Sequence, residues 1–224
     1  KTEAYSIDEQ LTWDELPVEQ ELEGAVAAAH PSTPPLPAAA SGEEPFNSAQ
    51  FGATVPPWSA AHAYTNLYGP KTGPTAASVV GNFKVNEAGT ENETHHIVLD
   101  MGSMPFPVLE GQSIAIIPPG TDAQGKPHHA RQYSIASPRN GERPGYNNLS
   151  LTIKRVLSDH QGKPVRGVAS NYMCDLKVGD KVQVIGPFGT SFLMPNHPRS
   201  NIVMICTGTG SAPMRAMTEW RRRL

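Results

Sequence analysis

Four consecutive residues in the middle of the chain combine a cation, an aromatic ring and a hydroxyl: Arg131, Gln132, Tyr133 and Ser134. Because alternate side chains of an extended strand share a face, Arg131 and Tyr133 are expected to project together. A guanidinium suits a phosphate and an aromatic plane suits a flat ring, so these residues are a candidate site for a flat phosphorylated cofactor. The competing interpretation is an ordinary strand with a surface arginine and a core tyrosine.

A second candidate is the expected start of a short helix, where Gly167, Val168, Ala169 and Ser170 bring a glycine and a capping serine together. Free backbone N–H groups and the helix dipole favour an anion at such a position. A plain helix cap is the alternative. Together with the strand that carries Arg131, this helix start could hold one pyrophosphate from two sides.

The third candidate is a glycine-rich turn that follows the apolar run 202–205 and precedes a helical stretch. Its residues are Thr207, Gly208, Thr209, Gly210, Ser211, Ala212 and Pro213. In this context a turn can approach the pyrophosphate of a dinucleotide. The turn lacks the Lys-Ser/Thr pair of a P-loop and the third glycine of the usual dinucleotide fingerprint. A tight strand-to-helix turn is the alternative interpretation.

Histidine and cysteine spacing predicts neither a metal site nor a nucleophilic residue. His95 and His96 are neighbours on an expected strand and therefore face opposite ways. Only two cysteines occur, Cys174 and Cys206, which are 32 positions apart. Because two cysteines cannot supply a four-thiolate iron–sulfur cluster, any such cluster must be carried elsewhere.

Six short segments with a period of two, separated by Gly, Pro and Asn, predict an antiparallel barrel. These segments are residues 79–85, 94–101, 113–117, 131–136, 148–156 and 181–185. A single helix is expected from near Ser170 to Leu176. Beyond Pro195, a buried strand at 202–205, the glycine-rich turn and a helix at 213–224 predict the first βα unit of a parallel, truncated α/β domain.

Composition divides the 224 residues into three regions. Residues 1–60 contain ten acidic residues and Lys1 as the only basic one, and they are expected to form an acidic, Pro-rich linker. Residues 61–195 are assigned to the barrel and residues 196–224 to the start of the second domain. From residue 61 onward, eleven acidic residues face seventeen basic ones, which favours anionic ligands or an acidic protein partner.

No segment approaches the roughly 18 to 20 consecutive apolar residues of a membrane-spanning helix, so a membrane-embedded role is excluded. The N-terminus lacks the pattern of a secretory signal, and two unpaired thiols fit a cytoplasmic location. A nucleic-acid partner is not expected, since the aromatic residues needed to stack on bases are not interleaved with the basic ones.

Taken in order, the motifs resemble the plant-type ferredoxin–NADP reductase family across residues 66–224. The resemblance is carried by Arg131-x-Tyr-Ser, Ser150-Leu-Thr-Ile-Lys-Arg, Gly167-Val-Ala-Ser-Asn-Tyr-Met-Cys-Asp-Leu and Gly208-Thr-Gly-Ser-Ala-Pro. Glu110-Gly-Gln-Ser-Ile and Gly186-Pro-Phe-Gly support it. The resemblance implies an FAD-binding barrel followed by an NADP-binding α/β domain. Such a protein moves electrons between NADPH and an iron–sulfur partner.

The resemblance also implies roles for individual residues. Arg131 would hold the FAD pyrophosphate, Tyr133 would stack on the isoalloxazine, and Ser134, as the catalytic residue, would lie beside the reacting nitrogen of the flavin. The other cofactor-binding residues that it implies are Gln132, Thr152, Ile153, Lys154, Gly167, Val168, Ala169, Ser170, Thr207, Gly208, Thr209, Gly210 and Pro213. The family's adenine-stacking tyrosine corresponds here to Ser158 or a neighbour.

Within the family, the strand around Thr152, the acidic Pro-rich stretch and the final Met217-Thr-Glu-Trp-Arg-Arg are most similar to the FAD-containing reductase component of benzoyl-CoA epoxidase systems, which serve in aromatic compound degradation. The expected partner is then an iron–sulfur electron carrier or an oxygenase component. Residues 1–224 alone are expected to keep FAD and to react little with NADPH. Two alternatives remain: a non-catalytic barrel that binds an anionic partner, and a flavin module without direct nicotinamide binding.

Overall fold

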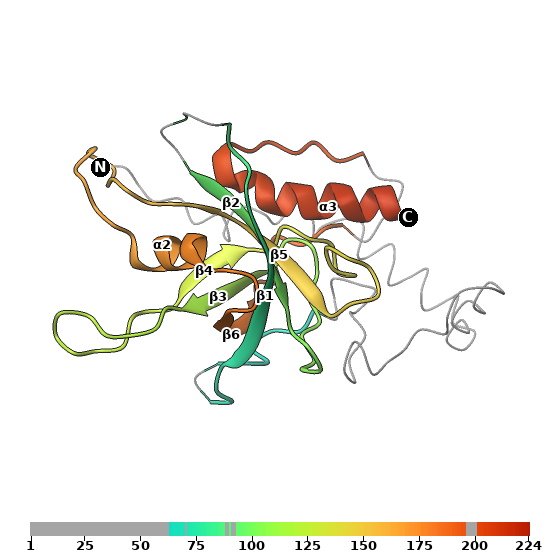
Figure 1. Ribbon diagram of the computed structural model, residues 1–224. Coiled ribbons are helices and arrows are strands. Elements are labelled where there is room, and N and C mark those ends of the chain that lie inside the picture. Colours follow the sequence, from blue (N-terminus) through green and yellow to red (C-terminus); the bar gives the residue numbers. More distant parts are fainter. Residues whose placement is uncertain (1–62, 70, 88–89, 91–92, 196–200) are drawn as a thin grey trace. The chain divides into compact units, whose positions relative to one another are not determined.

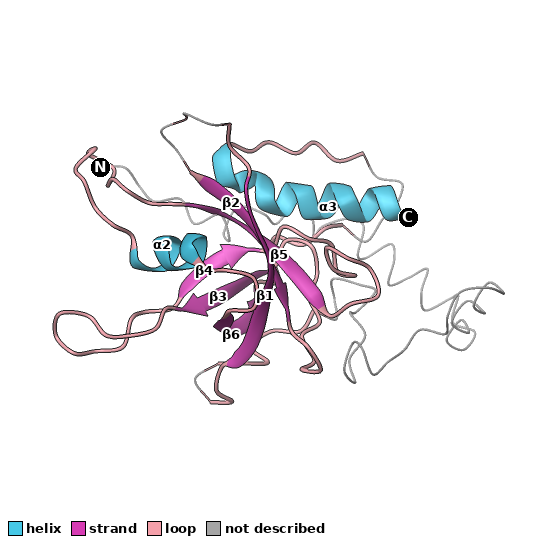
Figure 2. Cartoon of the chain, in the orientation of Figure 1, coloured by secondary structure: helices cyan, strands magenta, loops and turns pink. Residues whose placement is uncertain are grey.

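The computed structural model describes residues 63–69, 71–87, 90, 93–195 and 201–224, all of which lie in one compact unit, Asn47–Leu224. The predicted linker at 1–60 lies outside these described residues. Figure 1 shows the described elements coloured along the chain, and Figure 2 separates helices, strands and loops.

Six strands form one antiparallel sheet with the order β4-β3-β6-β1-β2-β5. Their bounds are β1 Thr75–Lys84, β2 Thr94–Asp100, β3 Ser113–Ile117, β4 Arg131–Ser134, β5 Asn148–Lys154 and β6 Lys181–Phe188. The sheet closes where Ile135, just past β4, bridges to Leu151 of β5 and where the Ala136 N–H donates to the Ser150 carbonyl at 2.8 Å. The predicted six-stranded antiparallel barrel is therefore confirmed.

Alternation along the strands builds the core of the barrel. Leu149, Leu151 and Ile153 of β5 are at most 1% exposed, and across the strand pair Ile97 and Leu99 of β2 are completely buried. These positions are two residues apart, so their side chains emerge on one face of the pleated strands. Burial of this apolar face supplies the main stabilisation of the barrel.

In the described part of the chain, two α-helices flank the sheet. The helix α2 spans Val168–Asp175 and begins two residues before the predicted start near Ser170. The helix α3 spans Ser211–Arg223 and follows a short 3-10 turn, η4, at Gly208–Gly210. None of the described helices is both long enough and apolar enough to cross a membrane.

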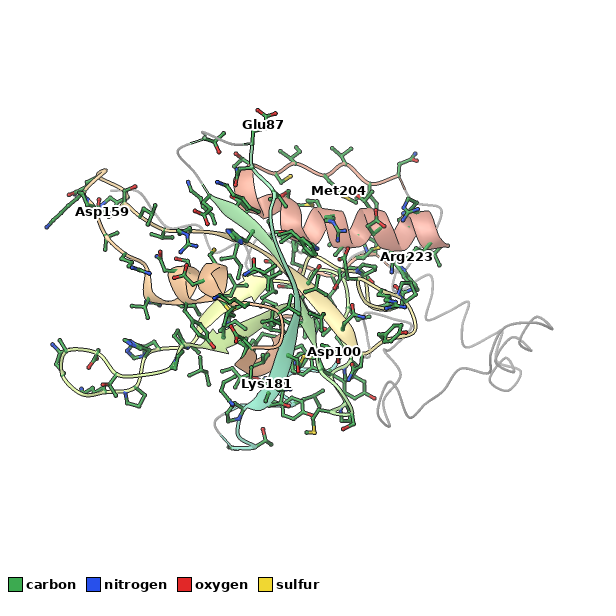
Figure 3. All side chains as sticks on the ribbon, in the orientation of Figure 1. Glu87, Asp100, Asp159, Lys181, Met204 and Arg223 are labelled. Atoms are coloured by element: carbon green, nitrogen blue, oxygen red, sulfur yellow. The ribbon has the colours of Figure 1, made fainter. Side chains whose placement is uncertain are left out.

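The helix α3 packs on the barrel through one apolar face and several basic side chains. Ala216 is completely buried and Met217 is 5% exposed. Arg223, which is labelled in Figure 3, lies at the C-terminal end of α3, and its guanidinium donates to the Asn140 Oδ1 at 2.7 Å. The Arg139 guanidinium lies 4.5 Å from the centre of the Trp220 ring. The helix is thus held against the segment that connects β4 to β5.

The predicted strand at 202–205 is wrong. These residues form no strand, no described residue pairs with them, and Val203 and Ile205 are each 86% exposed. A parallel strand needs neighbouring strands that satisfy its backbone and cover its side chains. None of the described strands pairs with residues 202–205. The Thr218 hydroxyl of α3 lies 3.7 Å from the Met204 sulfur.

Candidate functional site

One cavity of about 610 Å³ collects residues from β4, β5, the start of α2 and the η4 turn. Its volume falls within the range of small-molecule sites, about 300 to 1,000 Å³. The loops 118–130 and 155–167, which extend on the same side as α2 in Figure 1, also contribute to it. The lining residues are Pro118, Asp122, His128, His129, Arg131, Gln132, Tyr133, Thr152, Ile153, Lys154, Val156, Gly167, Val168, Ala169, Ser170 and Thr209.

Most residues predicted to bind a cofactor meet at this cavity, although they come from distant parts of the chain. Ser134, Thr207, Gly208, Gly210 and Pro213 do not line it.

Sequence reasoning did not assign Pro118, Asp122, His128, His129 and Val156 to the cavity. A signal for one of them was present, because His129 lies two residues before Arg131 and alternation places both on one side of an extended segment. The others could not be found from spacing, since loop conformation brings them to the cavity.

Arg131 and Tyr133 lie on β4 opposite β3, with Ile116 and Ile114 as their respective partners. Arg131 is exposed, and none of the described carboxylates forms an ion pair with it. Its guanidinium is therefore available to a phosphate. Burial, with a smaller effect from Cys174, raises the pKa of Tyr133 to about 12. The phenol is neutral at physiological pH and presents an uncharged ring.

The start of α2 offers backbone donors to the cavity. The first backbone bond at the helix start runs from the Asn171 N–H to the Gly167 carbonyl at 3.0 Å, so the amides of Val168, Ala169 and Ser170 precede it. These three residues line the cavity. Unpaired amides at a helix N-terminus favour an anion.

Ser170 does not cap this helix as the sequence predicted. Gly167 occupies the N-cap position, without any side-chain cap bond. The Ser170 hydroxyl instead accepts a hydrogen bond from the Val156 N–H at 3.1 Å and donates to the Gly167 carbonyl at 3.2 Å. The hydroxyl thus ties the helix start to the segment after β5, and the Ser170 backbone amide remains for a ligand.

Three residues of β5 line the cavity in different ways. Thr152 is half-buried and Lys154 is exposed, whereas the Ile153 side chain is 1% exposed and belongs to the core. Alternation explains this difference, since Thr152 and Lys154 share one face of the strand and Ile153 lies on the other. Of the three, Thr152 and Lys154 have side chains suited to a polar ligand.

Thr209 brings the η4 turn to the cavity wall. The preceding Gly208 has φ +54°, a left-handed conformation that favours glycine, and a Cβ added there would meet nothing within 4 Å. The space around Gly208 is therefore open. Backbone of this kind can approach a ligand closely.

A half-buried carboxylate, Glu142, positions α3, and with it the η4 turn. Glu142 accepts hydrogen bonds from Arg215 Nη2 at 2.6 Å, from Arg215 Nη1 at 2.8 Å and from the Ser150 hydroxyl at 2.8 Å. His96 Nε2 lies 3.4 Å from the same carboxylate. Burial alone would raise the pKa of Glu142, but its contacts with His96, Arg215 and Ser150 outweigh burial and hold the pKa well below its usual value.

The two cysteines differ in their surroundings. Burial raises the pKa of Cys174 to about 11, and its sulfur lies 3.9 Å from the Ile153 carbonyl. Cys206 is exposed. No cluster of three or more His, Cys, Asp and Glu side chains suited to a metal ion occurs in the part of the chain that the structure describes.

The fold and the cavity together define a class: a six-stranded antiparallel barrel with a cavity lined by β4, β5 and the N-terminus of a helix. No protein-family model matches the chain. Curated relatives and solved structures do resemble it, and they are ferredoxin–NADP reductases.

The cyanelle ferredoxin–NADP reductase of Cyanophora paradoxa is 47% identical over 153 residues, which cover 67% of this chain and 41% of the relative. The reductase of Thermosynechococcus vestitus is 38% identical over 204 residues, covering 90% of this chain and 49% of the relative. The chain therefore spans about half the length of the curated relatives it matches.

A solved structure of the ferredoxin–NADP+ reductase from Plasmodium falciparum has a TM-score of 0.57 and 28% identity, covering 69% of this chain and 55% of that one. Another structure of the Plasmodium enzyme, with 2'P-AMP, has a TM-score of 0.56 and 29% identity over 69% of this chain and 55% of that chain. The barrel thus has the fold of the ferredoxin–NADP reductases, and its sequence is related to theirs.

Proposed function

We propose that this chain carries the FAD-binding barrel of a flavoprotein oxidoreductase that passes electrons from NADPH, through FAD, to an iron–sulfur protein. The observation that carries the proposal is the single cavity where Arg131, Tyr133, the start of α2 and Thr209 meet. The similarity to ferredoxin–NADP reductases supports the same activity. Residues 61–195 would form the FAD-binding domain and residues 196–224 would begin the NADP-binding one.

The residues present fit a flavin dinucleotide. Arg131 and the amides of Val168 to Ser170 line one cavity, so they can donate to the same pyrophosphate. Tyr133 offers a neutral aromatic ring two residues along β4 from Arg131, about 7 Å at the rise of a strand. When bound, FAD supplies the hydride and single-electron chemistry, so no general base is needed from the chain.

The protein would orient the two nucleotides and exclude water between them. Thr152, Lys154 and Thr209 line the cavity beside Tyr133 and are assigned to the meeting point of flavin and nicotinamide. Ser134 follows Tyr133 on β4 and is assigned to the edge of the reacting ring. In the complete reductase, Ser134→Ala is expected to slow flavin reduction by NADPH and to leave the FAD content unchanged. Equal reduction rates would make Ser134 a structural residue.

Titration of the purified protein with FAD tests the central proposal. We expect a bound flavin with its visible absorption bands, and we expect Arg131→Ala to weaken FAD binding at least about tenfold, since a hydrogen bond to a charged group contributes about 1.5 to 3 kcal/mol. The matched control is Arg143→Ala, because Arg143 stacks on Tyr146 and does not line the cavity. Failure of the wild-type protein to bind FAD would refute this cavity as the FAD site. Equal losses of FAD affinity in Arg131→Ala and Arg143→Ala would also refute it.

The partner is proposed more narrowly as the oxygenase of a benzoyl-CoA epoxidase system, for which this chain would be part of the reductase. The acidic, Pro-rich stretch at 1–60 and the final Met217-Thr-Glu-Trp-Arg-Arg support this choice. The test compares NADPH oxidation by the complete reductase with the purified oxygenase and with a plant-type ferredoxin. If NADPH oxidation is faster with ferredoxin than with the oxygenase, the oxygenase is rejected as the partner. The flavoprotein proposal is unaffected by that result.

A further inference from the structure

The helix α2 is too short to keep its place without support from neighbouring elements. It has eight residues and no side-chain cap bond at its start. Isolated helices shorter than about 12 to 15 residues are marginal in water, so tertiary contacts must hold this one. Met173 and Cys174 bury their side chains in the barrel core, which fixes one side of the helix. Its polar side requires a different explanation.

Arg155, which follows β5, holds the polar side. Its Nη1 donates to the Asn171 Oδ1 at 3.1 Å and to the Asp175 Oδ1 at 2.7 Å, so one guanidinium contacts residues in two successive turns of α2. Its Nη2 donates to the Glu93 Oε1 at 3.0 Å. The Arg155 side chain is only 13% exposed, although it carries a charge. Such a buried cation requires these partners.

The contacts continue from Glu93 to the far end of α2. The Glu93 Oε1 lies 2.7 Å from His95 Nε2, and the other ring nitrogen of His95 contacts the Asn82 Oδ1. The Asn82 amide then donates to the Leu176 carbonyl at 2.7 Å, just past the last helical residue. Hydrogen bonds from His95, and then from Arg155, hold the pKa of Glu93 below its usual value. The carboxylate is therefore ionised at neutral pH, and its Oε1 contacts both His95 and Arg155.

Arg155 does not line the cavity that holds Arg131 and the start of α2. It lies instead in a separate hollow with Leu157, Pro164, Val165 and Arg166. Its guanidinium reaches toward the main cavity through Asn171, which is the neighbour of the lining residue Ser170 in α2. The start of that helix also depends on Asn171. Its side-chain amide donates to the Gly167 carbonyl at 2.8 Å and to the Val156 carbonyl at 3.0 Å.

We propose that Arg155 is a positioning residue for the diphosphate of the dinucleotide: through Asn171, Asp175 and Glu93 it holds the free amides at the start of α2 in the cavity wall. This inference rests on the proposed function, because it takes the anion to be the FAD pyrophosphate. Arg155 itself makes no contact with the ligand. Its removal lets α2 shift, and the loss falls on the phosphate-bearing part of the flavin rather than on its ring.

The test measures FAD affinity of the apoprotein for wild type, Arg155→Met and Arg155→Lys. We expect Arg155→Met to weaken FAD binding about tenfold. Arg155→Lys should restore part of the affinity, since an ammonium keeps the charge but cannot bind Asp175, Asn171 and Glu93 with one rigid fork. Riboflavin, which has the ring without any phosphate, serves as the second ligand. Its affinity should change less than twofold in Arg155→Met.

The matched control is Arg166→Met. Arg166 also pairs with Asp175, at 3.1 Å, but its side chain is 73% exposed and it has no link to Glu93. We expect wild-type FAD affinity in this variant. Glu93→Gln provides a milder variant should Arg155→Met fail to fold, as judged by far-UV circular dichroism. It should weaken FAD in the same direction.

Several results would overturn the inference: unchanged FAD affinity in the folded variant, equal losses for Arg155→Met and Arg166→Met, or equal losses for FAD and riboflavin. The last would mean that Arg155 supports the barrel as a whole. Failure of the wild-type protein to bind FAD would instead overturn the proposed function itself. If wild type binds FAD and Arg155→Met binds it equally tightly, only the positioning role of Arg155 is overturned.

Discussion

The ion pair between Glu142 and Arg215 gives the sharpest prediction for the attachment of α3. The change is Glu142→Gln, which keeps the shape of the side chain and removes its charge. In the folded protein the carboxylate accepts two hydrogen bonds from the Arg215 guanidinium and one from the Ser150 hydroxyl. Glutamine has one acceptor oxygen, so at least one of these donors loses its partner.

The size of the effect follows from burial and charge. A hydrogen bond to a charged group contributes about 1.5 to 3 kcal/mol when desolvated, whereas an exposed ion pair contributes about 0.2 to 1 kcal/mol. The side chains of Glu142 and Arg215 are 23% and 39% exposed, between these limits. We therefore expect a loss of about 2 kcal/mol in the free energy of unfolding, which lowers the melting temperature by roughly 4 to 8 °C for a domain of this size.

The effect has a defined pH dependence. The folded-state pKa of Glu142 lies below the ordinary value of 4.5. The stabilisation by ionised Glu142 is therefore complete above that value and is lost as pH falls toward the lower folded-state pKa. The difference between wild type and Glu142→Gln should be constant near neutral pH and should narrow below about pH 4.5.

Thermal unfolding followed by circular dichroism, at neutral pH and through a series of acidic buffers, measures both quantities. Glu219→Gln is the matched control, because Glu219 lies on the same helix but pairs at 2.7 Å with Arg222, whose side chain is 69% exposed. We expect this control to melt as wild type does. Equal melting of wild type and Glu142→Gln at neutral pH, or a difference that persists unchanged into acid, would refute the reasoning.

Three further predictions concern the cavity and the thiols. The phenol of Tyr133 should ionise near pH 12 rather than 10, and the absorbance titration of wild type minus Tyr133→Phe measures this; a difference curve centred near 10 would contradict it. At neutral pH a thiol reagent should modify exposed Cys206 rapidly. It should hardly modify Cys174, which is buried and has a pKa of about 11. Equal modification rates, measured by peptide mass spectrometry, would be inconsistent with the fold. Gly167→Ala should weaken FAD binding, because the new Cβ would lie 2.9 Å from the Val156 Cβ and the start of α2 must move. An unchanged FAD titration curve would contradict a contact between α2 and the ligand.

Local sequence pattern was sufficient to predict the barrel strands. The strand β3, Ser113–Ile117, was predicted with its observed bounds, and β5 was predicted with two extra residues at its end. The physical reason is that side chains in an extended chain alternate between two faces, so a period of two is visible without knowledge of any partner strand. The shared face of Arg131 and Tyr133 follows from the same rule.

Pattern alone misassigned features that depend on neighbours. The apolar run at 202–205 has the composition of a buried strand, but strand formation requires a paired neighbour, and no described residue provides one. Ser170 has the residue type of a helix cap, but its hydroxyl bonds the backbone of Val156 instead. In both cases the competing contact lies outside the local window of sequence.

The amino-acid sequence by itself determined which residues alternate, where the turns fall and which motifs have the chemistry of a dinucleotide site. Only the tertiary structure decided what holds that site in place. Arg155 and Glu93 are 62 positions apart, and Arg215 and Glu142 are 73 apart, so no spacing rule pairs them. Each pair forms because the closed barrel brings its two segments within hydrogen-bond distance, where partial burial makes a charge depend on its partner.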